Sequence, residues 1–207
     1  MERERAVVQI DAIWAHLARA ERFHGYRPAG VAATGVCGLV ASAIQSIVAP
    51  NPQANLDAYL GLWIGTALIC ITFIGLNLVL SYVQSGSRLK EQLTRQAVQQ
   101  FAPCLIAGAT ITWIIADHHP EKLNLLPGLW AICFSLGIFA SLPYMTPQIL
   151  WVASYYLVAG AGLLVWSRQE MALSAWMMAG SFGIGQLLMA YVLYADEGRT
   201  RGKIERE

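Results

Sequence analysis

The residues best suited to bind a metal form one short run, Asp117-His118-His119-Pro120-Glu121. Imidazole and carboxylate groups are ligands that zinc and other transition metals use in proteins. Adjacent side chains on one short segment point in different directions, however, so Asp117, His118, His119 and Glu121 do not form a regular ligand spacing. The competing interpretation is a polar turn that ends an apolar helix, with Pro120 preventing its continuation. The spacing favours the polar turn.

A second set of polar residues lies inside apolar sequence: Thr34, Asn77, Tyr155, Tyr156 and Gln186. At a rise of about 1.5 Å per residue, these residues fall roughly 8 to 12 Å from one end of their segments. Neutral donors and acceptors at one depth could line a small pocket open to the cytoplasm. They could equally form hydrogen bonds between helices, worth about 0.6 kcal/mol each. We favour the second role, with Asn77 and Gln186 as the expected couple.

These residues are carried by six apolar stretches between Pro28 and Tyr194, none with an Asp, Glu, Lys, Arg or His in its interior. About 20 apolar residues span a bilayer, and a single apolar segment can do so only as a helix. The sequence therefore predicts an all-α, polytopic membrane protein with one bundle of six transmembrane helices over residues 28–195. The predicted spans are approximately 29–49, 58–83, 98–116, 125–145, 148–166 and 171–194.

The composition supports this class and excludes several functions. The chain has 56% hydrophobic and only 13% charged residues, whereas soluble domains are about one quarter charged. Because no His lies in the predicted spans, ligation of haem by two intramembrane histidines is excluded, and the absence of Asp, Glu, Lys and Arg there argues against ion coupling through a buried carboxylate. We expect no cofactor and no nucleic-acid partner; the expected surroundings are the lipid bilayer.

The basic residues predict the orientation. Twelve of the fourteen precede the first span, lie between the second and third, or follow the sixth, and only Lys122 and Arg168 lie on the opposite side. The positive-inside rule then places both termini in the cytoplasm. Aromatic residues near the span ends predict two interfacial belts, with tryptophans mostly at the outer ends. The outer group is Trp63, Trp113, Trp130, Trp166 and Trp176.

The two terminal segments are predicted to lie on the cytoplasmic side. In residues 1–27, apolar residues recur at helical spacing from position 7 to 24, which indicates an amphipathic helix separate from the first span. Ile10, Trp14 and Leu17 on its apolar face could dock onto a protein partner, or the helix could simply lie among the lipid headgroups. Residues 196–207 are predicted to be a charged tail, and residues 84–97 a loop.

Small residues four apart indicate close helix packing at three places, Ala179 with Gly183, Ser181 with Gly185, and Gly61 with Gly65. In a six-helix protein we expect such pairs to pack against other helices of the same chain. A homo-oligomer built on them is the alternative.

Two runs, Phe101-Ala-Pro-Cys-Leu-Ile-Ala-Gly108 and Leu125-Leu-Pro-Gly-Leu-Trp130, resemble segments of uncharacterised bacterial six-span membrane proteins. The resemblance covers the third and fourth spans at most. It implies a location in the bacterial inner membrane, and it transfers no activity and no site residues.

Three functional hypotheses follow. The leading one is a small, non-enzymatic membrane protein that acts as a regulatory, sensory or assembly partner through residues 1–27 and 84–97. The second is a carrier or channel for a small neutral or apolar molecule, which would use the polar layer. The third is a membrane enzyme that uses the Asp117–Glu121 run as a metal site.

Overall fold

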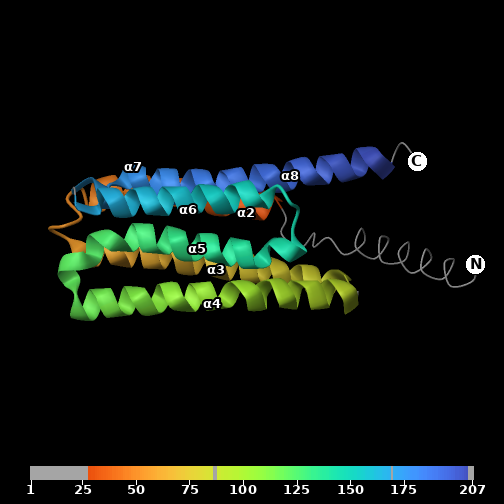
Figure 1. Cartoon of the computed structure of the whole chain (residues 1–207), viewed down its shortest axis with the longest axis horizontal. Helices are drawn as coiled ribbons and strands as arrows, with labels where there is room; N and C mark the ends of the chain where they lie inside the picture. Colours follow the sequence, from red (N-terminus) through yellow and green to blue (C-terminus); the bar gives the residue numbers. More distant parts are fainter. Residues whose placement is uncertain (1–27, 86–87, 169, 205–207) are drawn as a thin grey trace, which may run out of the picture.

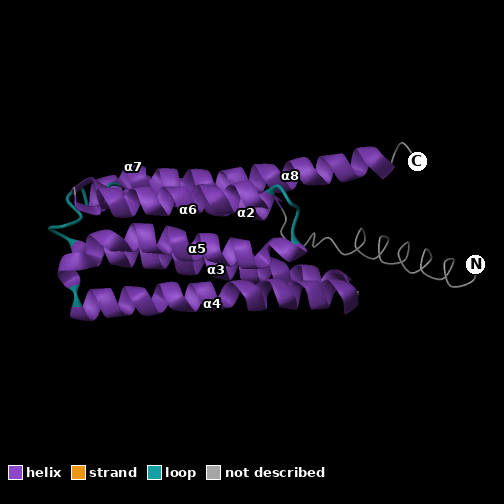
Figure 2. Ribbon diagram, viewed as in Figure 1, coloured by secondary structure: helices purple, strands orange, loops and turns teal. Residues whose placement is uncertain are grey.

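The structure is a computed structural model that describes residues 28–85, 88–168 and 170–204 (Figure 1). These residues are almost entirely helical and include no strand (Figure 2). The predicted amphipathic helix at residues 7–24, with Ile10, Trp14 and Leu17, lies outside the described residues. The α-helices are α2 (Pro28–Val48), α3 (Leu56–Ser85), α4 (Arg88–His118), α5 (Leu126–Ser141), α6 (Ile149–Val165), α7 (Ala175–Met178) and α8 (Gly185–Ile204).

Shorter helical segments extend or connect these helices. They are η1 (Pro120–Leu125), η2 (Leu142–Tyr144), η3 (Trp166–Arg168), η4 (Glu170–Leu173) and the π-helical η5 (Ala179–Ile184). The long helices lie side by side and alternate in direction, so that the start of α2 and the end of α8 lie at the same end of the bundle (Figure 1).

Five helical stretches are long and apolar enough to cross a membrane: Pro28–Val48, Leu56–Leu80, Val98–His118, Pro120–Tyr144 and Ala175–Arg199. A sixth apolar helix, Ile149–Val165, has 17 residues and a length of about 25 Å. The predicted all-α class is thus confirmed, and the described helices are compatible with a multi-pass membrane protein.

The boundaries differ from the prediction in two places. The prediction of a loop at 84–97 is wrong from Arg88 onward, because α4 begins there. Residues of high helix propensity, including Leu89, Lys90 and Glu91, allow the helix to extend beyond its apolar part. At the other end of the chain, α8 continues to Ile204 rather than stopping at 194.

The last predicted span changes its helical geometry along its length. The short α7 leads into the π-helical η5, which is followed by α8. A π segment changes the regular i→i−4 hydrogen bonding of a helix. Here the hydroxyl of Tyr155 on α6 donates a 2.5 Å hydrogen bond to the Gly180 carbonyl within that segment. A side chain of α6 therefore contacts the backbone where the last span changes its helical geometry.

Glycines set the closest helix contacts. The contact between α5 and α6 is the most extensive in the bundle, and a Cβ at either Gly128 or Gly160 would lie 2.8 Å from the carbonyl oxygen of the other. The predicted pair Ala179–Gly183 lies at a second contact, because a Cβ at Gly183 would lie 2.6 Å from Leu39 of α2. Neither Gly61 nor Gly65 has a neighbouring atom within 4 Å of the corresponding Cβ position.

The outer aromatic belt is only partly as predicted. Trp113, Trp166 and Trp176 are exposed, as lipid-facing residues should be. The expectation is wrong for Trp63, which is only 5% exposed. Its indole N–H donates to the Gln45 side chain, and a buried N–H needs such a partner. Trp130 is half-buried and donates to the hydroxyl of Thr112 at 2.7 Å.

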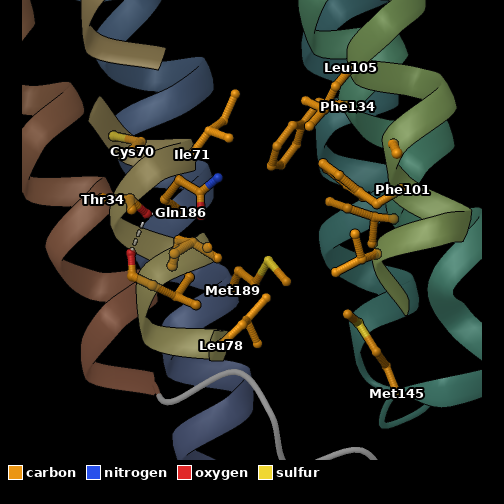
Figure 3. Close-up of a pocket in the computed structure, with 16 residues that line it drawn as sticks. Thr34, Cys70, Ile71, Leu78, Phe101, Leu105, Phe134, Met145, Gln186 and Met189 are labelled. Carbon is orange, nitrogen blue, oxygen red and sulfur yellow. Dashed lines mark hydrogen bonds between the residues drawn. The ribbon is translucent and has the colours of Figure 1, made fainter. Parts of the chain in front are cut away.

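The helices divide into two groups, which are joined by a buried core of α2, α5, α6 and α8 residues. Helix α3 packs mainly on α2, whereas α4 packs mainly on α5, and α3 and α4 make few contacts with each other. In the close-up view, α3 lies with α2 and α8 on one side of a gap, and α4 lies with α5 on the other (Figure 3). This arrangement leaves room for a cavity between the groups.

Candidate functional site

The cavity between the two groups has a volume of about 220 Å³. Among the residues that the structure describes, those lining the cavity are apolar apart from two polar side chains, and none is charged. Residues of α2, α3 and α8 face residues of α4 and α5 across it (Figure 3). The lining residues are Val31, Thr34, Cys70, Ile71, Ile74, Gly75, Leu78, Val98, Phe101, Ala102, Leu105, Phe134, Ile138, Met145, Gln186 and Met189.

Two local features keep the cavity open. Gly75 has no side chain, and a Cβ at this position would have no other atom within 4 Å. On the opposite wall the rings of Phe101 and Phe134 meet edge to face, with centroids 5.1 Å apart. Phe101 also packs against Gly137, where a Cβ would lie 2.6 Å from its ring. This packing fixes the Phe101 ring on α5, on the far side of the cavity from Gly75.

The two polar lining residues are Thr34 of α2 and Gln186 of α8. The Thr34 hydroxyl lies 2.7 Å from the carbonyl oxygen of Val31 in its own helix and 3.4 Å from the side-chain oxygen of Gln186. A hydroxyl has one hydrogen to donate, and the shorter contact is much the better hydrogen bond. Thr34 therefore satisfies little of the hydrogen-bonding capacity of Gln186.

Gln186 also lies beside the hydroxyl of Tyr156, which is completely buried. That hydroxyl makes no hydrogen bond of regular geometry within the described residues. The Tyr156 ring packs 4.8 Å from the ring of Phe134 and occupies the space that a side chain at Gly185 would need. Thr34, Gln186 and Tyr156 thus form a contiguous polar group between the cavity and the core.

The five residues predicted to share a polar layer therefore have different roles in the structure. Thr34 and Gln186 line the cavity, Tyr156 lies behind it in the core, and Tyr155 binds the π segment. The expected Asn77–Gln186 couple is wrong: Asn77 donates instead to the Phe73 carbonyl of its own helix at 2.8 Å. Asn77 does not line the cavity.

The predicted metal ligands form two separate pairs at the other end of the bundle. His118 Nδ1 lies 3.2 Å from Asp117 Oδ2, and His119 Nδ1 lies 3.5 Å from Glu121 Oε1. All four side chains are more than half exposed. Within residues 28–85, 88–168 and 170–204, no three His, Cys, Asp or Glu side chains come together as a metal site would require.

Two features of the site were not predicted from the sequence. Gly75 forms part of the cavity wall, Met189 also lines the cavity, and Met145 lies at its lower end as drawn in Figure 3. A signal for Gly75 does exist, because glycine inside a long apolar helix marks a place of close packing or open space. Methionines adapt readily to irregular contacts and suit a site that accepts a flexible molecule.

Comparison of the chain with protein-family models, with curated proteins and with solved structures finds no match. The functional interpretation therefore depends on the geometry of the helices and the cavity.

Proposed function

We propose that this protein is a six-span membrane protein that binds a small, predominantly apolar molecule in the cavity between α3 and α4. The observation that carries the proposal is the uncharged, mostly apolar lining of a space of about 220 Å³. A dry cavity of about 150 Å³ is large enough to bind benzene. This proposal corresponds to the carrier or channel hypothesis predicted from the sequence, but it claims only that the protein binds the molecule and not that it transports it.

Exposed apolar residues around the cavity support entry from the lipid. Ile71 of α3 and Val98 of α4 line the cavity and are 46% and 44% exposed, so the cavity reaches the surface along the seam between these helices. Leu68, Ile69 and Leu76 on α3 are also exposed. An apolar surface of this kind is stable next to acyl chains and would be costly in water.

The proposed orientation follows from the sequence. Twelve of fourteen basic residues lie before α2, in the 84–97 segment or after position 195, which favours cytoplasmic termini. The bacterial inner membrane is proposed on the resemblance of the two runs in the third and fourth spans. Thr34 and Gln186 would then lie in the cytoplasmic half of the bundle.

The partner hypothesis depends on residues 1–27, which lie outside the described residues, and on residues 84–97, for which no partner contact has been tested, so it stays a prediction. A bound molecule and a protein partner are compatible in a sensory protein, where ligand binding shifts the equilibrium between two conformations.

Filling the cavity tests the proposal. Gly75→Leu places a side chain in the cavity without meeting the backbone of another helix, because no atom lies within 4 Å of the Cβ position. Gly65→Leu is the matched control: it lies on the same helix, its Cβ position is equally open, and it does not line the cavity. Each protein is purified in a mild detergent, its co-purified small molecules are extracted, and mass spectrometry quantifies them per chain.

The wild type and Gly65→Leu should retain the same molecule in a fixed ratio to protein, and Gly75→Leu should lose it while eluting as the same species in size-exclusion chromatography. A molecule retained equally by Gly75→Leu, or no retained molecule in the wild type, would contradict the proposal.

A further inference from the structure

The geometry of the polar wall points to the chemical class of the ligand. Resting on the proposed binding function, we infer that the occupant is a neutral lipid of the surrounding bilayer that carries a carbonyl or hydroxyl group, and that the Gln186 side chain selects it by a hydrogen bond to that group.

The lining excludes charged headgroups. None of the described residues that line the cavity is basic, so an anionic phosphate would lack the charge-assisted partners that it needs. None is acidic, so a cationic amine would equally lack a counter-ion. A charge taken into an apolar space without a partner is strongly unfavourable. The occupant is therefore neutral.

The hydrogen-bonding capacity of Gln186 calls for a polar group on that neutral molecule. A glutamine amide has two N–H donors and one oxygen that accepts two hydrogen bonds. Within the described residues its polar neighbours are the Thr34 hydroxyl, whose hydrogen is directed to Val31, and the buried Tyr156 hydroxyl. The amide is turned toward the space between the two helix groups (Figure 3). A carbonyl or hydroxyl group on the ligand could accept a hydrogen bond from the Gln186 amide N–H groups, which the described residues leave available.

The access route identifies the bilayer as the source. The seam between α3 and α4 is bordered by exposed apolar side chains, among them Ile71 and Val98. A molecule that diffuses in the acyl-chain region meets this seam directly, whereas a water-soluble molecule would have to cross that region first. The occupant is for this reason a lipid rather than a soluble metabolite.

The test compares headgroups on one constant chain. A C12 alcohol bearing a photoreactive diazirine on its chain labels the purified full-length protein. Unlabelled dodecan-1-ol, dodecane, dodecyl phosphate and dodecyltrimethylammonium compete at equal mole fractions in the detergent micelle. Wild-type protein should prefer dodecan-1-ol over dodecane by about 3- to 10-fold, the range of one buried hydrogen bond. The two charged compounds should compete less well than dodecane.

Gln186→Met keeps the length of the side chain and removes its amide. This variant should still be labelled but should lose the preference for the alcohol, falling to less than about twofold. Asn77→Leu is the matched control, since Asn77 is an intrahelical amide outside the cavity lining, and it should keep the wild-type preference. Both variants are checked for the wild-type elution volume.

Equal competition by alcohol and alkane in the wild type, the best competition from a charged compound, or an unchanged preference in Gln186→Met would overturn the inference. If Gly75→Leu abolishes labelling, these outcomes contradict only the inferred ligand class and not the proposed binding function. Unchanged labelling of Gly75→Leu would contradict both the ligand class and the binding function.

Discussion

The indole N–H of Trp63 donates a 2.8 Å hydrogen bond to the side-chain oxygen of Gln45. The amide nitrogen of Gln45 in turn donates to the Leu173 carbonyl at 2.6 Å. Gln45 is only 1% exposed, so it provides hydrogen-bond partners for polar groups of two other segments in a buried position. These hydrogen bonds join α2, α3 and η4 near the end of the bundle that carries the Asp117–Glu121 turn.

Replacing Gln45 should therefore cost stability. Gln45→Leu leaves the Trp63 N–H and the Leu173 carbonyl buried without partners, which should lower the free energy of unfolding by about 1–3 kcal/mol. Equilibrium unfolding in mixed micelles measures this change. Asn77→Leu is the control, because the Asn77 amide donates to a carbonyl of its own helix and its loss should change the stability by less than about 0.5 kcal/mol. Equal effects of the two substitutions would contradict the role assigned to Gln45.

The contact between α5 and α6 should tolerate no side chain at Gly160. A Cβ there would lie 2.8 Å from both the Gly128 carbonyl oxygen and a side-chain carbon of Ile132. Gly160→Ala should therefore lower the free energy of unfolding by about 1–3 kcal/mol through overpacking. Gly162→Ala, two residues further along α6, meets no atom within 4 Å and should cause no loss, because alanine is the better helix former. The reverse order of stabilities in the same unfolding assay would count against this helix contact.

The proposed orientation predicts opposite labelling of the two ends of the bundle. The four native cysteines, which lie within the long helices, are first replaced by alanine so that they give no background labelling. In spheroplasts, a membrane-impermeant maleimide should label a cysteine introduced at the exposed Glu121 and should spare one at Gly198 of α8 until the membrane is opened. Labelling at Gly198 in intact spheroplasts would reverse the orientation.

The sequence predicted where each apolar helix lies more accurately than which way its side chains point. Position along a helix follows from counting residues, whereas rotation about the axis depends on the neighbours that the fold provides. Gly75 and Asn77 show the difference. They lie two residues apart on α3, about 200° apart around the axis, so Gly75 faces the cavity while Asn77 does not. Depth alone suggested that Asn77 would meet Gln186.

Other differences had similar causes. The partners of Gln45 on α2 are Trp63 and Leu173, which two other segments, α3 and η4, bring to it, and counting residues along one helix cannot predict such a meeting. The early start of α4 at Arg88 was missed because the charged residues there were interpreted as a loop, although their helix propensity is high. Hydropathy predicts the span and gives no information on a helical extension beyond it.

Photocrosslinking from inside the cavity in native membranes tests the central claim most directly. p-Benzoylphenylalanine is placed at Leu105, which lines the cavity, or at the adjacent Ile106, which does not line it and is 65% exposed. After irradiation, mass spectrometry identifies the lipids attached at each position. The account predicts one neutral lipid species, enriched at Leu105, and the mixed phospholipids of the bulk bilayer at Ile106. The same phospholipid mixture at both positions would contradict it.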